Sequence, residues 1–272
     1  MNILIIGASG LVGSHLLAEA LARGHEVIGT YRNTKTTGYK LWPLDLAEDR
    51  FLVAMLDLFK IDWVIHSAGW TDADGCEGNR PRCFEQNYTQ PVLVGDLCKA
   101  RGIRYCYVSS VYAKWPKLNA YATAKAQAEV SLMASLGKTV LIPRLISVWG
   151  KDANQKCFPY AVQRAHANCE VMRLPSDQII TPTWAGDAAY WIMRLMESEA
   201  AGVTAMAGDV SMTRPQWAEA VCPSVRVRAV KTRQLGQKAR RPLNCSTANT
   251  AIQSLFPRRC RPASDFLKTI AN

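Results

Sequence analysis

A chain of 272 residues can bury a full hydrophobic core, as one large domain or as a main domain with a small second lobe. Its 49% apolar and 20% charged residues are typical of a globular protein, and no apolar run has the length of a membrane-spanning helix, so we expect no membrane association. The nine cysteines are scattered without paired or histidine-matched spacing, which argues against a disulfide framework or a metal site and favours a reducing cytoplasm.

The net charge of +11 is unevenly distributed along the chain. Ten lysines and arginines, and no acidic residue, lie between Arg226 and Arg261. Such a cluster is either a solvated basic face or a sign of an anionic partner, such as nucleic acid, a membrane surface or a phosphorylated metabolite. Because no aromatic-interleaved recognition motif accompanies the tract, we expect no nucleic-acid partner.

Strands and helices are predicted to alternate through the first two thirds of the chain. Segment 2–6 lacks a basic n-region and runs straight into a glycine motif, so it is interpreted as a buried strand and not as a signal peptide. Further strands are predicted at 25–30, 40–42, 62–66, 104–109 and 138–143, and helices at 10–23, 48–59, 81–100 and 121–136. This alternation predicts an α/β fold with a doubly wound parallel (Rossmann) sheet, which binds ligands at the carboxyl ends of its strands.

After residue 150 the pattern is less regular. Helices are expected at 154–167, 187–196 and 214–221, with a strand at 170–174. These elements predict a small C-terminal lobe that packs over the carboxyl edge of the sheet. The division is placed at 1–150 for the main domain and 151–272 mainly for the lobe, with some segments returning to the main domain.

Three glycines at the spacing of a dinucleotide-binding turn follow the first strand. The first glycine permits the sharp turn, the second lets a pyrophosphate approach the backbone, and the third lets helix and strand pack closely. The N–H groups at the start of the helix would then face the phosphates. Since a strand precedes the turn and a helix follows it, we expect the whole turn to contact a cofactor: Gly7, Ser9, Gly10, Leu11, Val12 and Gly13.

The end of the second strand favours NADP(H) over NAD. An acidic residue there would bind the ribose 2′-OH of NAD, whereas an arginine accommodates the 2′-phosphate of NADP. Residues 29–35 contain no acid at this place and offer Arg32, with Lys35 as support.

Two further strand ends are expected to contact the cofactor. Asp45 and Leu46 follow the third strand and would lie beside the adenine, although Asp45 could equally cap the next helix. The fourth strand ends in Ser67, Ala68 and Gly69, whose small side chains suit a backbone pressed against the cofactor.

A Tyr-x-x-x-Lys pair, Tyr121 and Lys125, opens the helix after the fifth strand, and this spacing puts the phenol and the ammonium on one helix face. A free phenol has a pKa near ~10, which a nearby ammonium and an oxidised nicotinamide would lower. Tyr121 can then exchange a proton with a substrate oxygen while hydride moves to or from the nicotinamide. A serine hydroxyl at the preceding strand end would hold the same oxygen; of Ser109 and Ser110 only one can face the site, and Ser110 is our candidate.

These residues resemble an extended short-chain dehydrogenase/reductase, and they are most similar to the dTDP-4-dehydrorhamnose reductase group. The likeness spans nearly the whole chain. It is carried further by the segments 66–77, 180–187 and 202–208, by Asn87, and by Arg241-Pro242-Leu243-Asn244-Cys245.

The resemblance implies NADPH-dependent reduction at C4 of a 4-keto sugar carried on a nucleotide diphosphate. Residues 1–150 would then bind NADP and residues 151–272 mainly the substrate, with Arg241 and its neighbours neutralising the pyrophosphate. The implied site residues are a catalytic trio, Ser110, Tyr121 and Lys125, of which Tyr121 and Lys125 also contact the cofactor, and four substrate-binding residues, Thr71, Asp74, Trp149 and Arg241. Helices near 80–100 and 121–136 often form dimer faces in this superfamily, so a homodimer is a further expectation.

The chain departs from the family pattern near the expected sugar. Ser109-Ser110-Val111-Tyr112 stands where the family has a Thr-Asp-Tyr segment, the next loop is short, Cys245 replaces a serine, and Trp70 and Trp184 are bulky.

Two alternative functions remain open. One is an epimerase or dehydratase of the same fold, which would not consume NADPH stoichiometrically; a dehydratase would also need an acidic pair that is absent near Ser110. The other is a non-catalytic NADP-binding regulatory subunit, because the regulatory β subunit of methionine adenosyltransferase resembles the same group.

Overall fold

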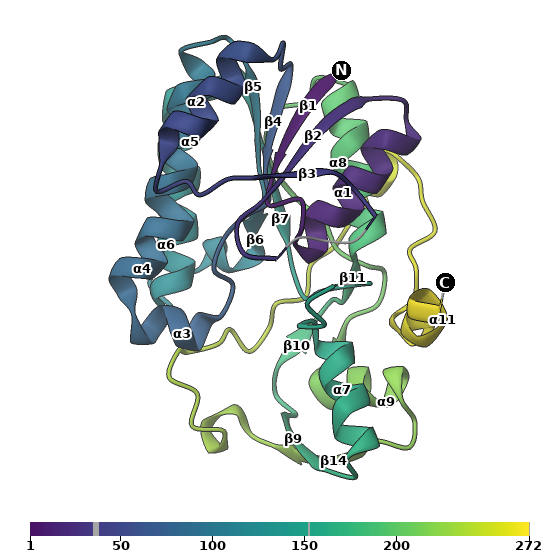
Figure 1. Ribbon diagram of the computed structural model, residues 1–272. Helices are drawn as coiled ribbons and strands as arrows, with labels where there is room; N and C mark the ends of the chain where they lie inside the picture. Colours follow the sequence, from purple (N-terminus) through teal and green to yellow (C-terminus); the bar gives the residue numbers. More distant parts are fainter. Residues whose placement is uncertain (35–37, 152, 272) are drawn as a thin grey trace.

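A parallel sheet forms the centre of the computed structural model, which describes residues 1–34, 38–151 and 153–271. Its eight strands follow the order β12-β7-β5-β4-β1-β2-β3, with β6 paired to β7 (Figure 1). The strands are β1 (Asn2–Ile6), β2 (Glu26–Tyr31), β3 (Leu41–Pro43), β4 (Trp63–His66), β5 (Arg104–Tyr107), β6 (Ser109–Ser110), β7 (Val140–Leu145) and β12 (Gly202–Ala205). The chain thus winds outward from β1 in both directions, so the carboxyl ends of all these strands share one edge.

Helices cover both faces of the sheet, as Figure 1 shows. One face carries α1 (Leu11–Ala22) and α8 (Ala185–Glu197); the other carries α2 (Asp49–Leu58), α5 (Gln90–Lys99) and α6 (Ala120–Leu136). Along β1, Ile3 and Ile5 pack into the first core layer, whereas Leu4 and Ile6 pack into the second. Burial on both faces explains the unbroken apolar run of this strand. The predicted doubly wound parallel sheet is confirmed.

The helix expected at 81–100 is divided by a π turn. It consists of α4 (Arg80–Phe84), the π segment η1 (Glu85–Thr89) and α5. The buried Asn87 lies in η1, where its side chain accepts a hydrogen bond from the Trp70 amide at 3.2 Å and donates one to the Trp70 carbonyl at 3.0 Å. The Asn87 carbonyl accepts the Tyr107 hydroxyl at 2.9 Å. Because π turns are frequent at functional sites, this one suggests that the region around Trp70 is functional.

A smaller lobe lies beyond the carboxyl edge of the sheet, in the lower part of Figure 1. Its elements are β8 (Val148–Trp149), α7 (Phe158–Ala167), β9 (Val171–Pro175), β10 (Ile179–Ile180), β11 (Thr183–Trp184), β13 (Met212–Thr213), α9 (Arg214–Val221), β14 (Arg226–Val230) and α11 (Phe266–Ala271). Helix α10 (Thr250–Leu255) returns to the main domain, where Ile252 joins the first core layer. Helix α7 begins later than predicted, because Pro159 favours the first helical turn and irregular chain precedes it. Trp149, Trp217 and Phe266 are central to the lobe's core.

The nine cysteines are free thiols. Cys98, Cys106 and Cys157 are buried, as their apolar surroundings suggest, but the same expectation for Cys169 is wrong. Cys169 is exposed, because the chain turns outward there after α7 with a φ of 54°. Within the described ranges, no helix is long and apolar enough to cross a bilayer, and no cluster of His, Cys, Asp or Glu side chains could hold a metal ion.

Candidate active site

The glycine turn between β1 and α1 leaves no room for side chains. Gly7 has a φ of 82°, and a Cβ there would lie 2.9 Å from the Ala68 backbone nitrogen. A Cβ at Gly13 would collide with the Gly7 carbonyl oxygen. The Gly10 amide donates to that same carbonyl at 3.0 Å, and no described side chain caps α1. The first amides of α1 therefore remain open to an anion.

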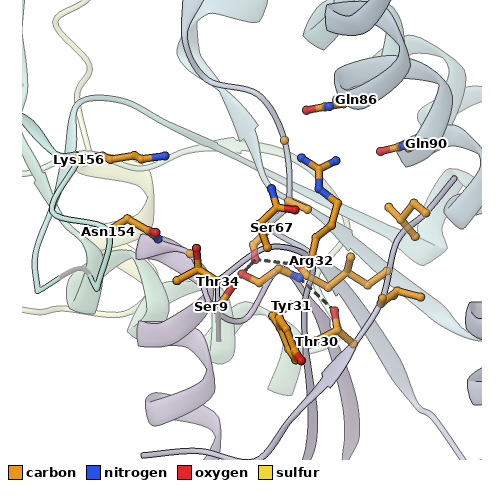
Figure 2. Close-up of a pocket in the computed structure, with 18 residues that line it drawn as sticks. Ser9, Thr30, Tyr31, Arg32, Thr34, Ser67, Gln86, Gln90, Asn154 and Lys156 are labelled. Carbon is orange, nitrogen blue, oxygen red and sulfur yellow. Dashed lines mark hydrogen bonds between the residues drawn. The ribbon is translucent and has the colours of Figure 1, made fainter. Parts of the chain in front are cut away.

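An open cleft of about 270 Å³ lies at the carboxyl ends of β1, β2 and β4 (Figure 2). It is lined by eight of the residues predicted to bind the cofactor: Gly7, Ser9, Gly10, Arg32, Leu46, Ser67, Ala68 and Gly69. Leu11, Val12 and Gly13 belong to α1 and do not line it. Asp45 does not line it either; its exposed carboxylate accepts the Ala47 amide at 3.1 Å within its own turn.

The charged residues found among the described lining of the cleft are basic. None of its described lining residues is acidic, whereas Arg32 and Lys156 are basic. Figure 2 shows the Arg32 side chain extending from the end of β2 across the cleft toward Gln86. Lys35, the predicted support of Arg32, lies outside the described residues. Two cations among these lining residues suit a ligand that carries several phosphates.

Besides the residues around Arg32 at the end of β2, four polar residues of the cleft were not indicated by the sequence. Gln86 and Gln90 reach it from η1 and α5, and Asn154 and Lys156 reach it from the loop that joins β8 to α7 (Figure 2). The four-residue spacing of the glutamines on one helix was a usable signal. The loop positions offered none, because tertiary packing alone brings them to the cleft.

The candidate catalytic side chains Ser110, Tyr121 and Lys125 meet where α6 begins. Asn119 caps this helix by accepting the Ala122 amide at 2.8 Å, which orients its first turn. Tyr121 is 7% exposed, and its phenol interacts with the Ser110 hydroxyl. Burial raises the pKa of Tyr121 well above its usual value, and the interaction with Ser110 opposes this only in part. The phenol is therefore protonated at neutral pH.

The two adjacent serines have different partners. The Ser110 hydroxyl meets Tyr121 and also accepts the Tyr112 amide at 3.2 Å. Ser109 instead donates to the Glu129 carboxylate at 2.5 Å, on the other side of the strand. The alternation of side chains along β6 thus directs Ser110, and not Ser109, toward the phenol.

Lys125 connects these side chains with the cleft. It is 3% exposed, its ammonium donates to the Val108 carbonyl at 3.2 Å, and it lies 4.5 Å above the Tyr107 ring. A Cβ built at Gly69, which lines the cleft, would be only 3.7 Å from Lys125 Nζ. Burial lowers the pKa of Lys125 to about 8, with Glu129 acting in the opposite direction. The ammonium is thus charged at neutral pH and becomes neutral as the pH rises above about 8.

Two of the four predicted substrate residues form an ion pair. Asp74 and Arg241 meet at 3.2 Å, and Asp74 also accepts the Ala239 amide at 2.8 Å. These contacts hold the segment around residues 239–241 beside α3 (Ala73–Gly78). Thr71 is exposed. Trp149 is placed differently from our prediction: it is completely buried and packs against Phe266, with ring centroids 6.2 Å apart. Its indole therefore has no free surface for a sugar.

Arg214, the first residue of α9, is a functional candidate that the sequence did not indicate. Its guanidinium stacks on Phe158 and Trp217, 5.1 and 5.3 Å from the ring centroids. Burial lowers the pKa of Arg214, and Arg241 lowers it further. Tyr112, another neighbour, is 5.9 Å from the Tyr121 ring. Two arginines near Tyr112, of which Arg241 is paired with Asp74, have the chemistry that suits an anion.

Comparisons with known proteins agree with this geometry. The family model described as RmlD substrate binding domain matches residues 1–272. The probable low-salt glycan biosynthesis reductase Agl14 of Haloferax volcanii is 27% identical over 82% of this chain and 79% of its own length. The dTDP-4-dehydrorhamnose reductase of Mycobacterium tuberculosis is 24% identical over 95% of this chain and 89% of its own.

A solved structure extends the likeness to three dimensions. The dTDP-4-dehydrorhamnose reductase of Bacillus anthracis, determined in complex with NADP, superposes with a TM-score of 0.86 over 99% of this chain and 98% of that one, at 19% identity. The shared fold and the full-length family match give one conclusion. The chain belongs to the RmlD substrate binding domain family and is an extended short-chain dehydrogenase/reductase, a class of NAD(P)-dependent oxidoreductases.

Proposed function

We propose that this protein uses NADPH to reduce the 4-keto group of a nucleotide-diphosphate sugar, as its relatives named dTDP-4-dehydrorhamnose reductase imply. The observation that carries the proposal is the position of Lys125. Its ammonium lies next to Gly69 of the cleft and one helical turn from Tyr121. A cofactor in the cleft and a proton donor would therefore meet at one point.

The cleft fits a dinucleotide with a 2′-phosphate. The crowded glycine turn and the uncapped start of α1 would hold the pyrophosphate, and Ser67 to Gly69 would lie along the cofactor. Arg32 would bind the 2′-phosphate, with Lys156 as a second cation in the cleft. When bound, NADPH supplies the hydride for the carbonyl carbon.

Tyr121 would supply the proton. A phenol whose pKa is raised by burial keeps its proton at neutral pH and can donate it to a carbonyl oxygen that gains negative charge. Ser110 would hold that oxygen through its hydroxyl. The Lys125 ammonium would stabilise the phenolate left behind.

The substrate diphosphate would lie between the two arginines of the lobe. Arg241 and Arg214 are close enough to influence each other, and both are near Tyr112. Arginine forks match phosphate geometry and are favoured where phosphates bind. On this basis residues 151–272 act mainly as the substrate lobe, while β12 returns to the main sheet.

A homodimer is also part of the proposal. Val130 and Met133 on α6 are apolar and exposed, at 71% and 36%, on the helix expected to form a dimer face. Exposed apolar side chains on one helix favour association.

The proposal is tested by adding NADPH and a panel of 4-keto nucleotide sugars to the protein. We expect one sugar to be reduced with one NADPH consumed per product. An epimerase would convert its substrate without net loss of NADPH, and a regulatory subunit would bind NADPH without turnover.

Replacing Arg32 with alanine tests the cofactor assignment. Loss of a charge-assisted contact costs about 1.5–3 kcal/mol, so we expect the Kd for NADPH to rise ~10- to 100-fold with little change for NADH. Calorimetric titration with both cofactors measures this. Arg50→Ala serves as the control, because Arg50 is 76% exposed on α2. Equal losses for NADPH and NADH would contradict the assignment.

Arg214→Met tests the diphosphate site. Methionine preserves the packing on Phe158 and Trp217 but removes the charge, so we expect the KM for the nucleotide sugar to rise about tenfold with kcat little changed. Arg226→Met, an exposed change on β14, is the matched control. An unchanged KM would remove Arg214 from the site.

A further inference from the structure

A buried carboxylate lies beneath the Tyr121–Lys125 pair. Glu129 is 4% exposed and follows Lys125 by four residues on α6, so both side chains share one helix face. Its carboxylate accepts Ser109 Oγ at 2.5 Å and Arg144 Nε at 3.0 Å. Ser109 and Arg144 lie opposite each other in register on β6 and β7. Strand pairing therefore holds the two groups that bind the carboxylate, and helix α6 places the carboxylate one turn from Lys125.

We propose that Glu129 is a positioning residue of this site: fixed by Ser109 and Arg144, its carboxylate keeps the buried Lys125 side chain charged. The role of Lys125 in the reaction rests on the proposed function. The ionisation of Lys125 can be measured without turnover. The proposal also gives the second serine a role: Ser110 is near Tyr121, and Ser109 donates a hydrogen bond to the Glu129 carboxylate.

The surroundings of Lys125 show why a carboxylate is needed. The ammonium makes its hydrogen bond to a neutral carbonyl, that of Val108, and stacks on the Tyr107 ring of β5. Its other ionisable neighbours in the described part of the chain are Cys76 of α3, Cys83 of α4, and His66 of β4, with Tyr121 one turn away on α6. Of these, His66 is kept neutral, because burial and Lys125 lower its pKa to about 3.

Among these described ionisable neighbours of Lys125, Glu129 is the carboxylate. Burial disfavours the charged form of a lysine, and it lowers the pKa of Lys125 to about 8. The Glu129 carboxylate opposes this effect. Without it, Lys125 would lose its proton at a lower pH, and the phenolate of Tyr121 would lose its stabilising cation within the working range. Arg144 in turn compensates the buried carboxylate, which would be costly alone.

Glu129→Gln tests the inference, because glutamine keeps the shape and removes the charge. We expect the ionisation midpoint of Lys125 to fall by about one pH unit. It is followed by NMR of protein carrying ¹³Cε-lysine, with the resonance assigned through Lys125→Arg. The alkaline limb of kcat should move by the same amount, with little change on the low-pH plateau. Glu197→Gln is the control: it removes a carboxylate of α8 that is paired with Arg23. It should leave both the Lys125 midpoint and the alkaline limb of kcat unchanged.

Each result has a defined meaning. A folded Glu129→Gln protein with an unshifted Lys125 midpoint overturns the inference. If that variant does not fold, Glu129→Gln/Arg144→Gln leaves no unpaired charge and must still show a lowered midpoint, by less than the single variant because the Arg144 cation is lost as well; an unshifted midpoint overturns the inference there too. A shifted midpoint in a protein that reduces no nucleotide sugar supports the inference and refutes the proposed function instead.

Discussion

Tyr121→Phe is expected to lower kcat about 10²- to 10⁴-fold, which is the range that a positioned proton donor contributes. The ring remains, so its edge-on contact with Tyr112 and the packing of α6 persist. The hydroxyl that interacts with Ser110, which we propose as the proton donor, is lost. Tyr121 is predicted to contact the cofactor but does not line the cleft, so the Kd for NADPH should change far less than kcat. Steady-state kinetics and calorimetric titration measure the two quantities.

Tyr190→Phe is the matched control. Tyr190 lies on α8, where its ring contacts Arg23 and Arg258, on the other face of the sheet from α6. Removing its hydroxyl should leave kcat unchanged. A Tyr121→Phe protein with full biological activity would instead favour the regulatory-subunit alternative.

Gly13→Ala is expected to abolish tight cofactor binding. The added Cβ would collide with the Gly7 carbonyl and approach the Ala8 Cα to 2.8 Å, so the turn between β1 and α1 must open. Since we propose that the turn itself holds the pyrophosphate, we expect the Kd for NADPH to rise on the order of 100-fold or more, about 2.7 kcal/mol. Forcing the overlap should also destabilise the fold by about 1–3 kcal/mol.

Thermal unfolding with and without NADPH separates these two effects. Gly78→Ala is the control, because a Cβ there would meet nothing closer than 3.9 Å. That variant should retain both stability and the NADPH-induced rise in Tm. A Gly13→Ala protein that is stabilised by NADPH as much as the wild type would disprove the role of the turn.

The sheet could be predicted from the sequence because its strands are buried on both faces. Such strands appear as short apolar runs, and the observed β1, β2 and β4 end within one residue of their predicted bounds. The small lobe was harder to predict. Its pairs β10–β13 and β11–β8 are two residues long on each side, too short to give a periodic pattern.

The local parts of the candidate site could also be predicted. The glycine spacing and the four-residue step from Tyr121 to Lys125 are defined within one turn and one helix, so sequence distance stands in for spatial distance. Contacts between distant segments gave no such signal. The Asp74–Arg241 pair, the entry of Lys156 into the cofactor cleft and the place of Arg214 beside Tyr112 all depend on how the lobe packs on the sheet.

Trp149 also shows that contacts between distant segments could not be predicted. Its match to an aromatic residue of the resembled family suggested a position near the sugar, but burial of a tryptophan depends on the tertiary environment and not on its neighbours in sequence. Here Phe266, from the end of the chain, covers it.

The most direct test follows the hydride. NADPH carrying deuterium at nicotinamide C4 is incubated with the protein and the nucleotide sugar that it reduces, and the product is examined by NMR and mass spectrometry. We predict one deuterium per product, bound to the sugar carbon that was the carbonyl, and loss of this transfer in Tyr121→Phe. Binding of NADPH and sugar with no label in any product, or transfer that is unaffected by the change at residue 121, would contradict the account.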